Sequence, residues 1–169
     1  MIAQTLLLVI FPLLLVLAAG WDLSSFTIPN TISICLIAAF AAFAMAAGMA
    51  PAVIGWHLLA GFIALAASFT LFALGYFGGG DAKLFAAIAL WLGFNSLLPY
   101  TLLVAIAGGA LALALLLARR IPLPATLASH SWISHLHDSK SGIPYGIALS
   151  AGALILLPQT ELFRLAAGG

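Results

Sequence analysis

Long apolar runs, separated by short polar or glycine- and proline-containing stretches, dominate this sequence. A helix that crosses a bilayer needs roughly 20 mostly apolar residues. Six runs reach or approach that length, over residues 2–20, 32–49, 53–74, 82–94, 97–118 and 143–157. The pattern therefore predicts an all-α, polytopic integral membrane protein with about six transmembrane helices in a single bundle, residues 1–169 forming one domain.

Turn-forming residues lie between the predicted helices or near their ends. They are Pro29-Asn30, the stretch from Gly48 to Pro51, Gly78-Gly79-Gly80 and Pro99, which is expected near the start of the fifth helix. The runs 82–94 and 143–157 are short for a full crossing. Such lengths favour tilt, local thinning of the bilayer or a helix that begins below the membrane surface.

Composition agrees with the membrane assignment and narrows the range of partners. Of the 169 residues, 65% are hydrophobic and 5% are charged, whereas soluble domains carry about 25% charged residues. The net charge of +1 provides no basic field for nucleic acid, so none is expected as a partner. The single cysteine, Cys35, excludes an intrachain disulfide and a Cys-x-x-Cys zinc module.

The basic residues predict an orientation in the membrane. Lys83, Arg119, Arg120 and Lys140 all fall on one side of a six-helix arrangement, and Arg164 is the exception. Because Lys and Arg are enriched in cytoplasmic loops, we expect both termini outside and a cytoplasmic connection over residues 119–142. The run 2–20 has no basic residue before it, which favours a first membrane helix over a removable signal peptide, although its last residues resemble a cleavage site.

Two acidic residues stand at helix ends on the expected cytoplasmic side. Asp22 follows the first apolar run and Asp81 precedes the fourth. An ionised carboxyl beside hydrocarbon is costly and requires a reason. Two carboxyls at one depth can meet, and repulsion between like charges then keeps one protonated while the other ionises. Such a pair can activate water and donate a proton to a peptide carbonyl.

A structural explanation competes with this catalytic one. Asp81 after three glycines has the pattern of a helix N-cap, and Asp22 on its own is expected to be a solvated acid where the first helix leaves the membrane. The glycines would then form a flexible turn. If instead they serve the site, they would adopt backbone conformations closed to other residues or allow close approach of a substrate or Asp81.

Three motifs, taken together, carry a resemblance to a known family. They are Asp22-Leu23-Ser24-Ser25-Phe26-Thr27-Ile28-Pro29-Asn30, Gly78-Gly79-Gly80-Asp81-Ala82-Lys83-Leu84 and Gly142-Ile143-Pro144-Tyr145-Gly146. In order and spacing they resemble the type IV prepilin leader peptidases, membrane aspartic peptidases of the GxGD type. The similarity is closest to the short branch that serves Flp-type (Tad) pili.

The resemblance implies a specific activity and site. Asp22 and Asp81 would be the catalytic pair of an aspartic endopeptidase in the bacterial inner membrane, with no metal or organic cofactor. Its substrates would be prepilin or pilin-like precursors, from which it would remove a positively charged leader at the cytoplasmic face. The residues expected to bind substrate or shape the site are Gly78, Gly79, Gly80, Lys83, Ile28, Pro29, Asn30, Pro144, Tyr145 and Gly146.

Other features of these motifs leave alternatives open. Lys83 either favours the charged form of a nearby carboxylate or anchors its helix at the membrane surface. Pro144-Tyr145-Gly146 either shapes the site or simply starts the last helix with an interfacial aromatic. The short branch commonly carries a basic residue where this chain has serine, phenylalanine and threonine before Ile28. The chain also lacks the cysteine-paired segment of longer relatives, so methyl transfer is not predicted.

The four histidines fall in two groups, three in the polar connection and one in the third apolar run. His130, His135 and His137 stand with Asp138 in the polar connection, where a solvated loop is expected rather than a metal site. Part of that connection is expected to lie on the membrane surface or to cover the opening of the site. His57 is expected to be hydrogen-bonded among the helices, with a proton relay as the alternative.

Two other classes of function remain. The acids could bind protons or cations in a small transporter, although its ionisable groups would be expected near the bilayer centre. The chain could also be a noncatalytic subunit of pilus assembly, which would bind a pilin without cutting it.

Overall fold

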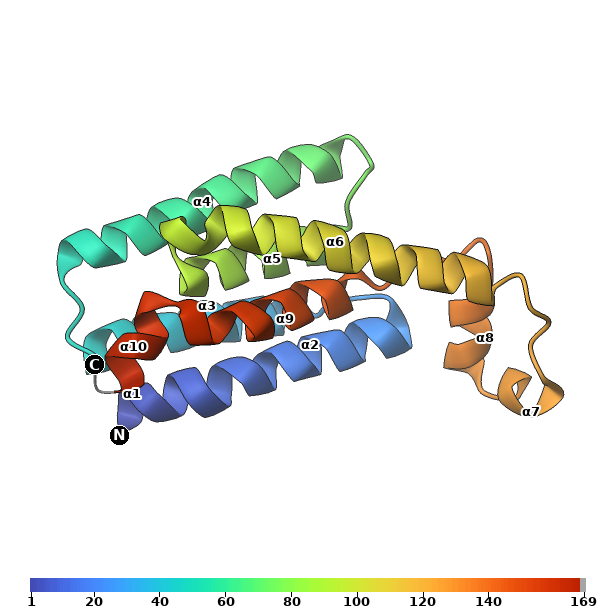
Figure 1. The fold of residues 1–169 in the computed structure, drawn as a ribbon, viewed down its shortest axis with the longest axis horizontal. Coiled ribbons are helices and arrows are strands. Elements are labelled where there is room, and N and C mark those ends of the chain that lie inside the picture. The colour runs from blue at the N-terminus through green and yellow to red at the C-terminus, as the bar shows by residue number, and fades with distance from the viewer. Residues whose placement is uncertain (168–169) are drawn as a thin grey trace.

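The computed structural model describes residues 1–167, and all regular structure within them is helical. The elements are α1 (Ile2–Thr5), η1 (Leu6–Ile10), α2 (Phe11–Ser25), α3 (Asn30–Ala46), α4 (Pro51–Ala73), α5 (Gly79–Leu92), α6 (Phe94–Ala118), α7 (Ala125–Ala128), α8 (Ser131–His137), α9 (Tyr145–Leu156), η2 (Leu157–Gln159) and α10 (Glu161–Ala167). Figure 1 shows the longer helices running alongside one another, with α7 and α8 at one end. The all-helical prediction is confirmed.

Three helices are long and apolar enough to cross a membrane. They cover Ile2–Ser25, in which α1, η1 and α2 follow one another, Pro51–Ala73 and Phe94–Ala118. Asn30–Ala46 and Tyr145–Gln159 are shorter apolar helices. These helices indicate a membrane protein, while the number of crossings stays a prediction.

Helix α5 forms the centre of the bundle. It packs against α3, α4, α6 and α9, and every residue from Leu84 to Leu92 is buried. The Trp91 ring stacks on Phe11 with centroids 4.7 Å apart, and its Nε1–H donates to the carbonyl of Leu36 at 2.9 Å. A helix that is apolar on all sides buries all of them, so this short, apolar helix occupies the core.

Four helices, α3 to α6, begin earlier than the apolar runs predict, and the difference is largest for α5 and α6. The fourth predicted helix begins at Gly79 rather than at residue 82, because two of the three glycines adopt helical conformation. The fifth begins at Phe94 rather than at residue 97, so Pro99 lies inside α6. The boundary between α5 and α6 is instead Gly93, whose φ of 78° is readily available only to glycine.

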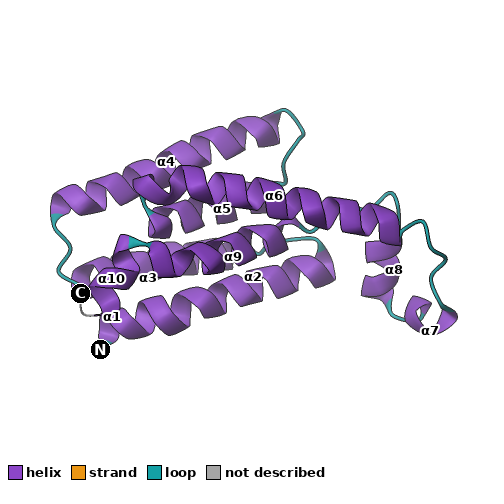
Figure 2. Ribbon diagram, in the orientation of Figure 1, coloured by secondary structure: helices purple, strands orange, loops and turns teal. Residues whose placement is uncertain are grey.

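The long polar connection is folded rather than extended. It contains the short helices α7 and α8, joined by loops (Figure 2). Arg119, at the end of α6, donates hydrogen bonds to the carbonyls of Leu136, Ser141 and Gly142 at 2.9, 3.2 and 2.9 Å. One guanidinium therefore fastens both α8 and the turn that leads into α9 to the end of α6.

Candidate functional site

Asp22 lies inside the last turn of α2 and is 4% exposed. The expectation of a solvated boundary acid is therefore wrong for Asp22: α2 continues to Ser25, which carries the carboxyl into the bundle. Its Oδ2 accepts a hydrogen bond from the backbone N–H of Gly146 at 2.7 Å. A bond from the first turn of α9 thus holds a carboxylate of α2.

Asp81 is the third residue of α5 and is half-buried. The proposal that Asp81 is the N-cap is wrong, because the N-cap is Gly78 and Asp81 lies within the helix. Its Oδ2 lies over Gly78, so close that a Cβ added to that glycine would stand 2.5 Å from it. Its Oδ1 is buried and has no hydrogen-bond partner among the described residues.

The two aspartates open onto one cavity, although they lie far apart in the sequence. The cavity has a volume of about 340 Å³. It is lined by Asp22, Phe26, Thr27, Ile28, Asn30, Gly78, Gly79, Gly80 and Asp81. The end of α2, the loop that follows it and the start of α5 therefore meet at the same end of the bundle.

The three glycines act through close packing and not through unusual backbone conformations. Gly78 has φ −72° and ψ 143°, which other residues adopt freely, and Gly79 and Gly80 are helical. The expectation of conformations closed to other residues is thus wrong, as is the flexible turn for Gly79 and Gly80. A Cβ would instead stand 3.2 Å from the Phe72 ring at position 79 and 3.2 Å from Ile28 Cβ at position 80.

The Ile28-Pro29-Asn30 motif connects α2 to α3 beside this cavity. Ile28 is buried against Gly80, Pro29 is the N-cap of α3, and Asn30 lines the cavity. Lys83 does not line it; its Nζ donates to Asn30 Oδ1 at 2.9 Å. This bond ties the first turn of α3 to α5 and so fixes the relation between two of the three motifs.

The third motif contacts Asp22 through one residue and helix α6 through another, and none of its residues lines the aspartate cavity. Pro144 is the N-cap of α9, and Gly146 donates to Asp22. A Cβ at position 146 would stand 2.8 Å from Asp22 Oδ2 and 3.0 Å from Ile28 Cδ1. Tyr145 does not line the aspartate cavity; its ring packs against Gly108 of α6 and lies 6.1 Å from that of Phe77.

Two contributions to the site were not singled out in the sequence. Phe26 and Thr27 line the cavity, and Phe26 ends α2 in the left-handed region at φ 55°. The Phe26 ring contacts that of His135 edge-on at 4.6 Å, which brings α8 beside the cavity. The sequence left open that the polar connection covers the opening of the site, but it does not identify this contact, because the contact depends on how the connection folds.

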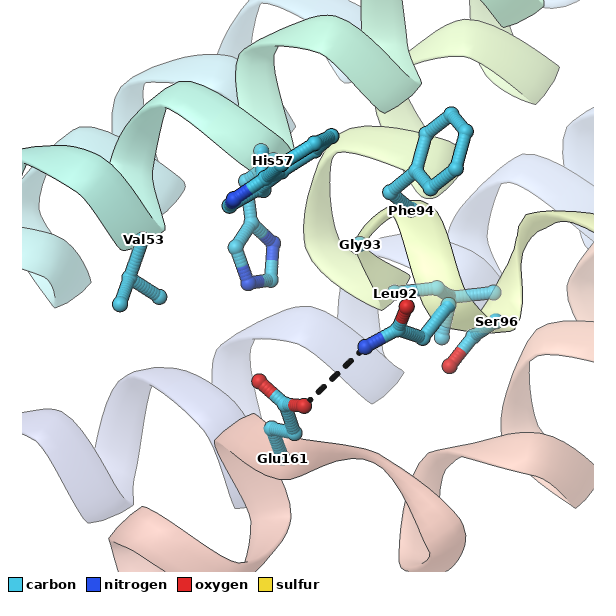
Figure 3. Close-up of a pocket in the computed structure, with 9 residues that line it drawn as sticks. Val53, His57, Leu92, Gly93, Phe94, Ser96 and Glu161 are labelled. Carbon is cyan, nitrogen blue, oxygen red and sulfur yellow. Dashed lines mark hydrogen bonds between the residues drawn. The ribbon is translucent and has the colours of Figure 1, made fainter.

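His57 belongs to a different cavity, shown in Figure 3. Its Nδ1 lies 2.8 Å from the carbonyl of Leu90, which confirms the predicted hydrogen bond between helices. Within residues 1–167, no three His, Cys, Asp or Glu side chains gather as a metal site would require.

Comparison with known proteins adds one finding. No curated protein and no solved structure matches the chain. The model of the type IV leader peptidase family matches residues 9–113, a stretch that contains both Asp22 and Asp81. Because this match covers more than half of the chain, the protein belongs to the type IV leader peptidase family.

Proposed function

We propose that this protein is a membrane-embedded aspartic endopeptidase that removes the leader from Flp-type prepilins, with Asp22 and Asp81 as its catalytic pair. The observation that carries the proposal is the single cavity that both Asp22 and Asp81 line. The family is one of leader peptidases and its match includes both residues, which supports the same reading.

The surroundings of the two carboxyls suggest different roles in the reaction. A hydrogen bond from a backbone N–H stabilises a carboxylate, so Asp22, held by Gly146, is suited to act as the general base. A buried oxygen without a partner favours the neutral acid, so Asp81, whose Oδ1 has no partner among the described residues, is suited to act as the general acid.

The reaction then proceeds in two steps. Asp22 takes a proton from water while the water oxygen attacks the scissile carbonyl carbon, and Asp81 gives its proton to the carbonyl oxygen. The first step thus forms a diol intermediate at the former carbonyl carbon. In the second step the carbon–nitrogen bond of this intermediate breaks as Asp22 passes its proton to the leaving amine. Asp81 takes a proton from one hydroxyl of the diol at the same time, so the pair returns to its initial state.

The position of the cavity suits a substrate that is part soluble and part membrane-embedded. Helix α5 has 14 residues and is about 21 Å long, less than the roughly 30 Å of a bilayer core. Asp81, in its first turn, can therefore lie at the boundary of the hydrocarbon layer. A precursor with a basic leader in the cytoplasm and an apolar helix in lipid would present its junction at that depth.

The test is replacement of each aspartate by asparagine in a strain that coexpresses a Flp-type prepilin. We expect Asp22→Asn and Asp81→Asn each to abolish leader removal, read as a shift in precursor mobility and by N-terminal sequencing. Asparagine keeps the shape of the side chain but cannot exchange the proton.

Asp138→Asn is the matched control, because Asp138 is exposed in the connection between α6 and α9. It should process the prepilin at the wild-type rate. Full processing by both site variants would refute the catalytic pair. A wild-type protein that binds the prepilin without cutting it would instead indicate a noncatalytic assembly subunit.

A further inference from the structure

A second polar cavity lies at the end of the bundle opposite the aspartates. Gln4, near the start of the first helix, donates to the carbonyl of Ala166 in α10 at 2.8 Å, whereas Asp22 lies at the end of that helix. Roughly 27 Å of helix separates Gln4 from Asp22. The cavity has a volume of about 370 Å³ and is lined by Val53, Trp56, His57, Leu92, Gly93, Phe94, Asn95, Ser96 and Glu161.

Three side chains of this cavity, those of Glu161, Asn95 and His57, offer acceptor atoms. The Glu161 carboxylate accepts a hydrogen bond from Asn95 Nδ2 at 3.3 Å, drawn as the dashed line in Figure 3. Since a carboxylate only accepts, the amide nitrogen of Asn95 must face it, which leaves Asn95 Oδ1 as a further acceptor.

His57 adds a third acceptor from a buried position. The side chain is 4% exposed and lies against Gly93, where an added Cβ would stand 2.9 Å from His57 Cε1. Its Nδ1 donates to the carbonyl of Leu90, because that carbonyl can only accept. In a neutral imidazole Nε2 is then the acceptor. Figure 3 shows the imidazole and Glu161 facing the same space.

Aromatic rings border the same cavity. Trp56 and Phe94 lie with centroids 5.6 Å apart, tilted by 49°, and are 57% and 41% exposed. Aromatic faces attract cations. A carboxylate, two neutral acceptors and two aromatic rings together suit a cation that carries N–H groups.

A second hollow, which adds a basic side chain to the shared Glu161, adjoins the cavity. It has a volume of about 330 Å³, is lined by Val53, Glu161, Arg164 and Leu165, and shares its first two residues with the cavity of His57. The Arg164 guanidinium donates to the carbonyl of Gln159 at 3.5 Å, which leaves its other N–H groups for an anion. Guanidinium groups are well matched to phosphate.

We propose that these adjoining hollows bind the headgroup of an ethanolamine phospholipid. The primary ammonium hydrogen-bonds to Glu161, Asn95 Oδ1 and His57 Nε2, the phosphate pairs with Arg164, and the acyl chains lie along the exposed Leu165. A choline headgroup has no N–H and cannot make the first set of bonds. This inference is independent of the peptidase activity, since the site lies at the other end of the bundle.

The test is native mass spectrometry of the full chain in detergent, titrated with phosphatidylethanolamine or phosphatidylcholine of the same acyl chains. We expect the wild type to bind the ethanolamine lipid roughly tenfold more tightly, as expected for charge-assisted hydrogen bonds. Glu161→Gln should abolish this preference, and Arg164→Gln should weaken binding of both lipids. Arg120→Gln removes an exposed cation at the other end of α6 and should change neither.

Three outcomes would overturn the proposal. The first is equal binding of both lipids by the wild type, and the second is an unchanged preference in Glu161→Gln. The third is that soluble O-phosphoethanolamine competes as effectively as the lipid does, which would indicate a site for a free amine. Thermal unfolding of each variant checks its fold. If Glu161→Gln is unstable, Trp56→Leu tests the aromatic contribution and should weaken binding of the ethanolamine lipid several-fold.

Discussion

Replacement of Gly146 by alanine tests whether the backbone of α9 positions the Asp22 carboxylate. The added Cβ would stand 2.8 Å from Asp22 Oδ2 and 3.0 Å from Ile28 Cδ1. Apolar carbon atoms prefer separations of about 3.5 Å or more, so the contact with Ile28 alone is too short by roughly 0.5 Å. The 2.8 Å approach to Asp22 Oδ2 is shorter still, so either α9 or the carboxylate must also move by roughly 0.5 Å to reach an ordinary C···O separation, which stretches the 2.7 Å hydrogen bond from the Gly146 N–H.

The two consequences of this change have different magnitudes. Overpacking of a core costs about 1–3 kcal/mol, part of which is offset because alanine favours a helix over glycine by about 0.5–1 kcal/mol. A displacement of about 1 Å at a reacting group costs on the order of 100-fold in rate. We therefore expect Gly146→Ala to stay folded while its leader cleavage falls by roughly 10- to 100-fold.

The assay is the initial rate of cleavage of a purified prepilin in detergent, with thermal unfolding measured on the same samples. Gly109→Ala is the matched control, because Gly109 lies in α6 and an added Cβ there meets nothing within 4 Å. It should keep the wild-type rate. Wild-type cleavage by Gly146→Ala would show that Asp22 does not depend on this contact for its position.

The remaining predictions concern the proton balance of the pair and the bonds around the site. The rate of cleavage should follow a bell-shaped pH profile, since acid protonates both carboxyls and removes the base, while alkali ionises both and removes the acid. A rate that does not change with pH would contradict a pair in which one carboxyl is protonated and the other ionised. Lys83→Met removes the bond to Asn30 and should slow cleavage by no more than about fivefold, as expected for one exposed hydrogen bond; complete loss would mean that the ammonium acts on the substrate. Arg119→Gln removes three bonds to the polar connection and should make trypsin cut there several-fold faster while the helical circular dichroism is unchanged; equal digestion of the two proteins would refute this anchoring role.

The helical architecture was predictable because burial of apolar residues is a property of each segment. The apolar runs marked the principal helices, and the short fourth run became the core helix α5. The ends of α5 and α6 were less predictable. Gly79 and Gly80 entered the helix and Pro99 came to lie within α6, because packing overrides the weak local preferences of these residues.

The roles of the glycines could not be predicted from the sequence. A run such as Gly78-Gly79-Gly80 suggests unusual backbone conformations, whereas the structure requires small residues for contact with Asp81, Phe72 and Ile28. The space at each of these glycines is determined by residues that are distant in the sequence. The residues beside a glycine in the sequence therefore do not show how much space it has.

The sequence by itself determined that the protein is an all-helical membrane protein with two acidic residues at helix ends, since hydrophobicity and charge are properties of the residues themselves. Only the tertiary structure decided that Asp22 and Asp81 line one cavity, that Gly146 holds Asp22, and that Glu161 and His57 face a second cavity at the opposite end. These relations depend on which helix faces pack together, and that packing is set by side-chain shape across the whole bundle rather than by any one segment.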